Sequence, residues 1–391
     1  MLSRCTMRPA IYLDHAATTP LAPAVRAALE PFLGAEFGNP SSRHPLGVRA
    51  SSALDEARRR AARAVGGRPD GVVFTSGGTE ANNLAVLGFA RARRRRGAHI
   101  VLGPTEHPSV RAPALSLCDE GFEVEEARLD ARGDLDLEDL ERRLRPDTVL
   151  VALMLVSNEL GTLYPLARAA RLVRARSPAA ALHTDAVQAA GKVELSLSAL
   201  GVDSLSVSAH KIHGPKGSGA LLLAEGAEPP RPLLQGGGQE RGLRSGTEHV
   251  AGCVGLGLAL ELAAQDAESG AQAPSAARAL LARLLGEMEG VRVLAPGSAR
   301  APSILSAVLP GPPAEVWMHH LEVHGVMTSA GSACHAKEKA ASPALLALGL
   351  TPDEARRVLR FSFARTTTLA EVEAAAEALG AVARELGAVA R

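Results

Sequence analysis

Short apolar runs alternate with longer amphipathic runs between about residues 50 and 225. Short β-branched runs are typical of buried strands, whereas apolar residues that recur every three or four positions indicate helices. The expected strands are Val72–Thr75, Ile100–Leu102, Val149–Leu155, Ala181–Thr184 and Leu205–Ser208. Because helical runs separate these strands, the pattern predicts an α/β protein with a mostly parallel sheet and helices on both faces.

Two helices have readable ends. The first, Ser51–Val65, stops at a pair of glycines, and the last begins at a capping box of Thr368 and Glu371. A small, polar, proline-bearing stretch near Ala263 indicates a joint between domains or a bend in a long helix. A second, smaller α/β unit is expected after it.

Charge and composition exclude some classes of function. The 391 residues include 43 basic and 42 acidic side chains, a net charge of +1, so the chain lacks a general field for nucleic acid or an anionic membrane. Aromatic residues make up only 3%, so a flat cofactor would stack on something else, with histidine the expected partner. If a lysine amine does chemistry, the candidates are Lys192, Lys211, Lys216, Lys337 and Lys339.

The cysteines indicate the redox environment of the protein. Four cysteines lie far apart without a C-x-x-C pair, so neither a zinc site nor a disulfide framework is expected, and no other metal site is predicted. A reduced, cytoplasmic location fits best. The first residues lack the apolar stretch of a secretory signal, and the longest apolar run, Val149–Val156, is too short to cross a bilayer.

A glycine turn follows the first expected strand, at Ser76-Gly77-Gly78-Thr79, and leads into a helix. Such a turn presents free N–H groups and the positive end of the helix dipole, which suits a phosphate. It matches neither a P-loop nor a dinucleotide fingerprint. By itself it is equally consistent with a plain strand-to-helix turn.

Two further turns carry reactive side chains. Asp185 lies just past a strand with Gln188 three residues later, and a carboxylate there suits a protonated ring nitrogen, although a helix cap is an equal alternative. Lys211 follows another strand, where a desolvated amine becomes nucleophilic enough for a Schiff base. Lys216 is expected to be a turn residue, and Lys192 a surface residue.

Ten segments together resemble the cysteine desulfurase and selenocysteine lyase family, which lies within the class V aminotransferase-like enzymes that use pyridoxal 5′-phosphate (PLP). They cover nearly the whole chain in the same order: YLDHAATTP, GNPSSRH, TSGGTEANN, EHPSV, SNELGT, HTDAVQ, SAHKIHGPKG, GGGQERGLRSGTE, SAGSACHA and RFSFART. The resemblance implies a PLP-dependent transferase type I-like fold. It implies a large domain of residues 16–262 and a small domain of residues 1–15 and 263–391.

The resemblance also implies a role for each matching residue. Lys211 would carry the cofactor as a Schiff base and His107 would stack on its ring. Asp185 would pair with the ring nitrogen and Gln188 with the ring hydroxyl. The implied phosphate ligands are Gly78, Thr79, Ser208, His210 and, from the neighbouring subunit of a homodimer, Thr247. Asn158 and Arg360 would hold the substrate carboxylate, for which an arginine is a two-pronged donor.

Cys334 is the sulfur-accepting residue that the family motif implies. A lone cysteine is more often a buried hydrophobe, but this one lies in a small, polar stretch typical of an exposed loop. His335, Lys337 and Lys339 follow it and are as consistent with a solvated loop as with a role in raising the thiolate fraction.

The implied reaction removes sulfur from L-cysteine and leaves L-alanine and a persulfide on Cys334. Selenium release from L-selenocysteine is the nearest alternative, because CHAKEKAASPALLALGL and Ser157 depart from the usual family sequence. An aminotransferase or β-lyase that does not use Cys334 and a non-catalytic relative are more distant alternatives. The sulfur acceptor is left open among iron–sulfur cluster assembly, tRNA thiolation and a dedicated pathway.

Overall fold

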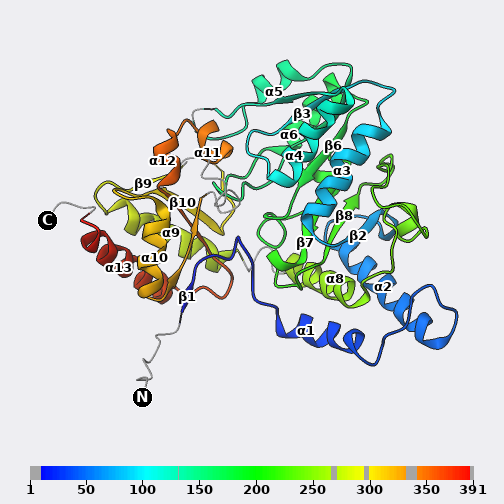
Figure 1. Cartoon of the computed structure of the whole chain (residues 1–391), viewed down its shortest axis with the longest axis horizontal. Coiled ribbons are helices and arrows are strands. Elements are labelled where there is room, and N and C mark those ends of the chain that lie inside the picture. Colours follow the sequence, from blue (N-terminus) through cyan, green and yellow to red (C-terminus); the bar gives the residue numbers. More distant parts are fainter. Residues whose placement is uncertain (1–9, 131, 266–270, 295–298, 332–340, 388–391) are drawn as a thin grey trace.

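The chain folds into two lobes that lie side by side (Figure 1). The structure is a computed structural model of the whole chain, and it describes residues 10–130, 132–265, 271–294, 299–331 and 341–387. The larger lobe surrounds a seven-stranded sheet and the smaller lobe a four-stranded one. The predicted division at residue 263 stays a prediction.

The large sheet confirms the mostly parallel arrangement. Strands β4, β3, β5, β6 and β7 are neighbours in that order and run parallel, and β8 is antiparallel to β7 and β2. All five expected strands form, and the pattern missed β4 and β8. The strands are β2 (Val72–Thr75), β3 (His99–Leu102), β4 (Glu123–Glu126), β5 (Thr148–Ala152), β6 (Ala181–Asp185), β7 (Ser204–Ser208) and β8 (Gly219–Leu223).

Helices cover both faces of this sheet because alternate strand residues point to opposite sides. Val72 and Leu222 belong to the apolar cluster that includes α2 and α8, whereas Val73 and Leu221 belong to the cluster of α3 and α4. The helices are α1 (Pro23–Leu29), α2 (Pro45–Arg63), α3 (Gly78–Ala92), α4 (Pro108–Ser116), α5 (Leu137–Arg143), α6 (Leu166–Arg176), α7 (Leu197–Leu200) and α8 (Val250–Gln265).

Helix α2 begins earlier than the sequence pattern predicts. His44 caps it by accepting a hydrogen bond from the Gly47 N–H, and Pro45 occupies the first turn, where its missing N–H costs nothing. The expected start at Ser51 therefore lies inside the helix.

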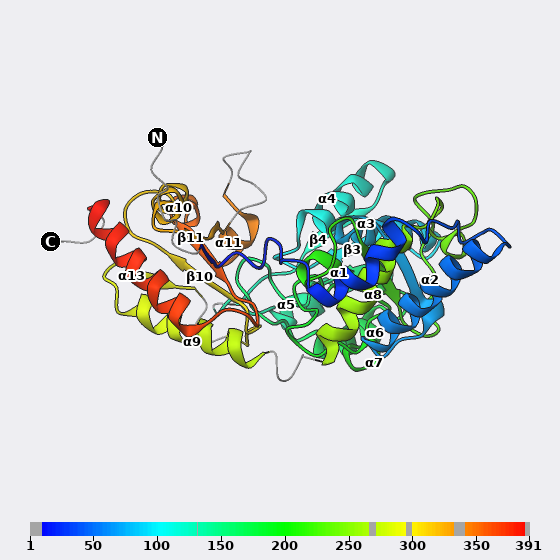
Figure 2. The same ribbon diagram turned by 90° about the horizontal axis from the view of Figure 1, so that it is seen from below.

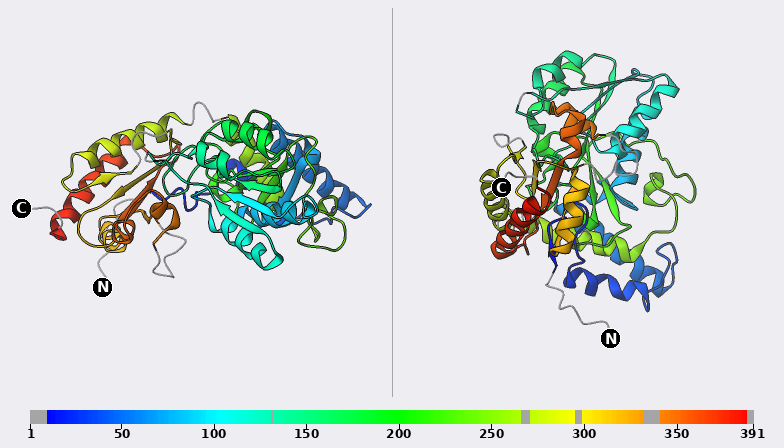
Figure 3. Two further views of the ribbon diagram at one scale, coloured as in Figure 1. Left: turned by 90° about the horizontal axis from the view of Figure 1, so that it is seen from above. Right: turned by 60° about the vertical axis from the view of Figure 1, so that its left-hand side comes forward.

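The small lobe is an antiparallel sheet in the order β12-β13-β10-β9, with α9 and α13 lying side by side (Figure 3). Trp317 of α10 is fully buried in the same core. The predicted capping box of Thr368 and Glu371 is confirmed at the start of α13. The elements are α9 (Gln272–Gly286), β9 (Arg292–Val293), β10 (Ile304–Val308), α10 (Ala314–Val323), β12 (Ser329–Ala330), α11 (Pro343–Ala347), α12 (Pro352–Arg356), β13 (Val358–Ser362) and α13 (Leu369–Glu385).

The N-terminal segment joins the two lobes. Strand β1 (Ile11–Tyr12) pairs with β11 (Val326–Met327) of the small lobe, and the chain then crosses to the large lobe and α1 (Figure 2). Asp14 forms an isolated bridge with Ser362 of β13 on the way. Of the helices in the described residues, none has both the length and the apolar character that a bilayer crossing requires.

Candidate active site

A cavity of about 330 Å³ opens where the parallel strands of the large sheet end. Ligands of open α/β sheets collect at this end, and the volume is within the range for a small organic ligand. Most residues with predicted roles in binding or catalysis line this one cavity. They are Gly78, Thr79, His107, Asn158, Asp185, Gln188, Ser208, His210, Lys211 and Arg360.

Lys211 lies on the short 3-10 helix Ala209–Lys211 that follows β7. Its amine donates hydrogen bonds to the carbonyl oxygens of Ala16 and Ala17, at 2.5 and 2.8 Å. The N-terminal segment thus holds the amine at the cavity wall. An amine here is in position to react with an aldehyde bound in the cavity.

Asp185 is the last residue of β6 and is buried. One carboxylate oxygen accepts a hydrogen bond from the Asn82 amide at 2.8 Å, and the other accepts one from the Val187 N–H at 2.9 Å. These bonds fix the direction of the carboxylate. No regular helix follows β6 directly, so the alternative of a helix cap is not what the structure describes for residues 186–190.

Asn82 was not among the predicted site residues and lies on the buried face of α3. Its amide also donates to the Ser109 hydroxyl at 2.8 Å, and its oxygen lies 3.1 Å from the His183 ring nitrogen Nε2. One amide therefore connects Asp185 to α4. The two asparagines of TSGGTEANN could have indicated a buried polar residue. The sequence alone does not show which of them faces the core and which faces solvent.

His107 caps α4 and accepts a hydrogen bond from the Ser109 N–H. Its Nδ1 also lies 2.7 Å from the Ser109 hydroxyl oxygen. Because Ser109 is bonded to Asn82 as well, the histidine ring and the Asp185 carboxylate belong to one hydrogen-bonded network.

The other end of the cavity suits an anion. Gly78 and Thr79 begin the 15-residue helix α3, whose N-terminal N–H groups and dipole favour a phosphate. A side chain at Gly78 would have its Cβ 2.7 Å from the Val187 side chain, so any larger residue would force Val187 to move. Burial and the nearby Lys211 charge lower the pKa of His210 to about 4, so His210 is neutral at pH 7.

Thr247 lies outside this arrangement. It is exposed and, among the described residues, is not part of the cavity lining. The segment that carries it is tied to the start of α3 because Arg244 pairs with Glu80 at 2.9 Å, and Glu80 in turn accepts from the Ser76 N–H.

Arg360 of β13 comes from the small lobe and is 4% exposed. One guanidinium nitrogen lies 3.0 Å from an Asp14 carboxylate oxygen, and another donates to the Asn158 carbonyl oxygen at 3.0 Å. Burial raises the pKa of Asp14 even though Arg360 lowers it. The resemblance named Arg360 and Asn158, whereas Asp14, although within YLDHAATTP, was not recognised as the partner of the arginine.

The chemistry of these groups fits PLP. The cavity has an amine for the aldehyde, a carboxylate for a protonated ring nitrogen, a histidine for the ring and a helix N-terminus for the phosphate. Gln188 donates to the Ala16 carbonyl oxygen, and its own oxygen is buried without a hydrogen-bond partner among the described residues. A buried acceptor without a partner lowers the stability of the folded state, unless a ligand donates a hydrogen bond to it.

Several predicted residues lie outside the described residues. Cys334, His335, Lys337 and Lys339 fall within residues 332–340. Their roles stay predictions.

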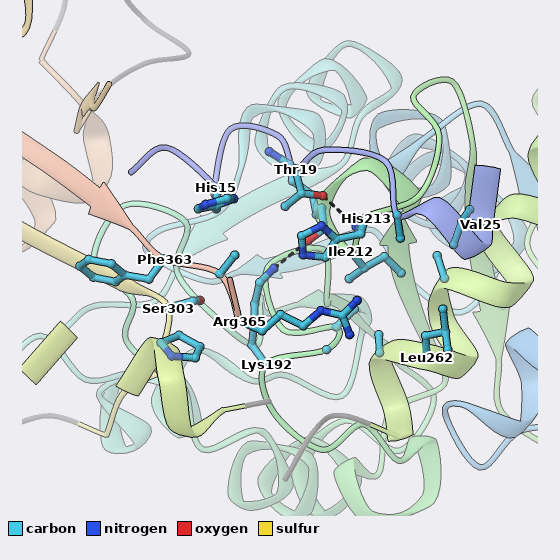
Figure 4. A pocket seen from close by; sticks show the side chains of 18 residues that line it. His15, Thr19, Val25, Lys192, Ile212, His213, Leu262, Ser303, Phe363 and Arg365 are labelled. Carbon is cyan, nitrogen blue, oxygen red and sulfur yellow. Dashed lines mark hydrogen bonds between the residues drawn. The ribbon is translucent and has the colours of Figure 1, made fainter. Parts of the chain in front are cut away.

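Lys192 is not the surface residue that the sequence analysis expected. It lines a second, smaller cavity of about 60 Å³ that lies between the two lobes and that Lys211 also borders (Figure 4). Its amine donates to the main-chain carbonyl oxygen of Lys211 at 3.3 Å. A polar residue type is a weak guide to exposure when the polar atom finds a partner inside the protein.

Comparison with known proteins identifies the family. The profile of the aminotransferase class-V family matches residues 11–375. A cysteine desulfurase IscS from Dictyoglomus turgidum is 39% identical over 363 residues, which are 93% of this chain and 91% of the relative. A solved "NifS-like protein" superposes with a TM-score of 0.90 at 33% identity, over 96% of this chain and all of that one. A solved "SspA in complex with cysteine" has a TM-score of 0.79 at 32% identity and covers 90% of this chain and 99% of that one.

The chain therefore belongs to the class V aminotransferase family. Within that family it is a PLP-dependent enzyme of the cysteine desulfurase group.

Proposed function

We propose that the protein binds PLP at Lys211 and removes sulfur from L-cysteine, giving L-alanine and a persulfide on Cys334. The observation that carries the proposal is the meeting of Lys211, Asp185, His107 and Arg360 around one cavity. When bound, PLP supplies an electron sink for the negative charge that develops at the substrate Cα.

Asp185 and His107 prepare the cavity for the ring. The Asp185 carboxylate would accept a hydrogen bond from the protonated ring nitrogen and stabilise its positive charge, and the Asn82 amide keeps the carboxylate in place. His107 is held by Ser109, and its ring would stack on the cofactor. Gly78, Thr79, Ser208 and His210 bind the phosphate.

Arg360 and Asn158 bind the substrate carboxylate. Asp14 and the Asn158 carbonyl oxygen hold two guanidinium nitrogens of Arg360, and the buried Nε has no hydrogen-bond partner among the described residues. An arginine fixed in this way loses little side-chain entropy when a carboxylate arrives.

Lys211 and Cys334 carry out the chemistry. The Lys211 amine, once exchanged for the substrate amine, removes the proton from Cα as a general base. The Cys334 thiolate then attacks the substrate sulfur, so a sulfur–sulfur bond forms as the Cβ–sulfur bond breaks. The electron pair of the broken bond stays with the carbon fragment, which takes up protons and leaves as alanine.

The proposal includes a cytoplasmic homodimer with shared active sites. Thr247 is exposed near the start of α3 and does not line its own cavity, so a second copy is needed to bring a threonine to the phosphate. Leu33, Phe37 and Val48 are exposed large apolar side chains, at 67%, 74% and 53%, and supply apolar surface for such a contact. An acceptor protein takes the sulfur from Cys334.

Mass spectrometry of Cys334 after incubation with L-cysteine tests the proposal most directly. The expected result is the mass of one added sulfur on the peptide that contains Cys334. Lys211→Ala is expected to lose the visible absorption of the bound cofactor, and Cys334→Ala is expected to keep that absorption but to make no alanine. Undiminished cysteine turnover by Cys334→Ala would overturn the desulfurase assignment, and preferential turnover of L-selenocysteine would replace the substrate.

A further inference from the structure

The loop of residues 157–163 lies between two strands of the large sheet in sequence, but the small lobe holds it in place. The loop comes after β5 and turns back on itself, because the Ser157 N–H donates to the Thr162 carbonyl oxygen at 3.0 Å. Its tip, residues 158–161, includes Asn158, which lines the cavity. The contacts of the tip therefore decide where Asn158 lies relative to Arg360.

Four consecutive carbonyl oxygens of the tip accept hydrogen bonds from the small lobe. The first is that of Asn158, which accepts from Arg360 at 3.0 Å. The next three are those of Glu159, which accepts from the Ser306 hydroxyl at 2.5 Å, Leu160, which accepts from Arg300, and Gly161, which accepts from the Ala301 N–H at 2.9 Å. A shift of the tip would break several of these bonds together.

Apolar packing fixes the same tip. The Leu160 side chain is fully buried in an apolar cluster with residues of the small lobe. Gly161 has a φ of +69°, and a Cβ there would lie 2.9 Å from the Ile304 carbonyl oxygen of β10, so a larger residue would be strained and would push the tip away from β10. The other buried members of the cluster are Leu294, Val308, Leu345, Leu350, Ala355 and Val358.

Ser306 connects the tip to the strand pair that carries Arg360. Ser306 of β10 is the register partner of Arg360 in β13, and directly opposite side chains of an antiparallel pair lie on the same face. Ser306 is 1% exposed. The two neighbouring side chains thus bond two neighbouring carbonyl oxygens of the loop.

We propose that Ser306 and Leu160 are positioning residues for the substrate carboxylate, which fix the tip of the loop on the small sheet and so set the place of Asn158 relative to Arg360. This inference rests on the proposed function, in which Asn158 and Arg360 bind that carboxylate. A site fixed before the ligand arrives binds it more tightly. Because Lys211 follows a strand of the large sheet, a loosened tip weakens the binding of the carboxylate and leaves the cofactor in place.

Two ligands that differ only in the carboxylate test this inference on the full chain loaded with PLP. L-Alanine is the proposed product, and ethylamine is the same molecule without the carboxylate. The change in the visible absorption of the cofactor on titration gives the Kd of each. Ser306→Ala is expected to weaken L-alanine about fivefold, the factor that one hydrogen bond contributes, and to leave ethylamine unchanged. KM for cysteine is expected to rise by a similar factor while kcat stays as in the wild type.

Ser329→Ala is the matched control for the serine. Ser329 of β12 opposes Arg360 from the other side and is also buried. Among the described residues, its hydroxyl has no bond to the loop that the substitution would remove. Ser329→Ala is therefore expected to bind L-alanine as the wild type does.

A second pair of variants separates positioning from stability. Leu160→Ala is expected to lower the melting temperature and to weaken L-alanine but not ethylamine, because it removes the anchor of the tip. Leu350→Ala, in the same cluster but outside the loop, is expected to lower the melting temperature alone. Leu160→Met keeps the volume and is expected to restore the binding of L-alanine.

Arg360→Gln separates the inference from the proposed function. It removes the guanidinium and is expected to weaken L-alanine at least about tenfold. Wild-type binding of L-alanine by Arg360→Gln would contradict the proposed carboxylate site, and the inference with it. Weak binding by Arg360→Gln but wild-type binding by folded Ser306→Ala and Leu160→Ala would overturn the positioning role alone. Equal weakening of L-alanine and ethylamine in those two variants would also overturn it, because the effect would not depend on the carboxylate.

Discussion

Asn82→Asp places a second carboxylate against Asp185 with almost no change in shape. The amide nitrogen that now lies 2.8 Å from an Asp185 oxygen becomes an oxygen. Two unit charges at this distance repel by about 6 kcal/mol at an effective dielectric constant of about 20. The folded variant therefore keeps a proton on the pair, as like-charged carboxylates do when they share a site.

The cost of keeping this proton depends on pH. An unfolded aspartate ionises near pH 3.9, and holding a proton costs about 1.4 kcal/mol for each pH unit above that value. The expected loss is about 1.5 kcal/mol at pH 5 and about 4 kcal/mol at pH 7, which is below the repulsion of the fully ionised pair. Because the folded state binds the extra proton, stability falls as pH rises.

Urea unfolding of the cofactor-free protein at several pH values measures this slope. The matched control is Asn83→Asp, one position along the same helix, whose amide donates to the carbonyl oxygens of Thr79 and Ser109 rather than to a carboxylate. The control is expected to show a much smaller pH dependence. Equal slopes for the two variants, after subtraction of the wild-type curve, would refute the account of the network around Asp185.

Two further substitutions test charged groups around Arg360. Asp14→Asn removes the ion pair to Arg360 and is expected to raise KM for cysteine about tenfold while the visible cofactor band stays as in the wild type; an unchanged KM would contradict a role in placing the arginine. Burial raises the pKa of Glu159 to about 7, above its unfolded value of 4.5. The folded protein therefore loses stability as the pH rises from about 4.5, because the buried carboxyl keeps a proton that the unfolded chain releases. Glu159→Gln is therefore expected to be more stable than the wild type by about 3 kcal/mol at pH 8 and not at pH 4, and melting curves that differ equally at both pH values would contradict this reasoning.

The sequence predicted five apolar strands of the large sheet and missed two others, the polar β4 and the apolar β8, whose sequence GALLL has no β-branched residue. Four of the five expected strands lie inside the sheet and are buried on both faces, so their runs are continuous and easy to read. Strand β4 has the sequence EVEE at the edge of the sheet, where polar residues face solvent. No hydrophobic pattern reveals a strand of this kind, because its pairing with β3 is a main-chain interaction.

The candidate site divides in the same way. Lys211 and Asp185 were found because their chemistry is unusual at the end of an apolar strand. Asn82 and Lys192 were missed or misplaced because their importance lies in contacts with residues distant in sequence. The role of Cys334 rests on the family resemblance alone, since it lies outside the described residues.

The crossing segment after β1 has a consequence for how the enzyme is made. Asp14 contacts Arg360 and the Ala16 N–H donates to the Ser362 hydroxyl, contacts that span 346 residues in each case. A ribosome must therefore synthesise nearly the whole chain before the substrate end of the cavity can close. Contacts of such long sequence separation form late and slowly. The ability to bind substrate thus marks a finished chain, and a nascent or truncated one that lacks β13 has the large sheet but no place for the carboxylate.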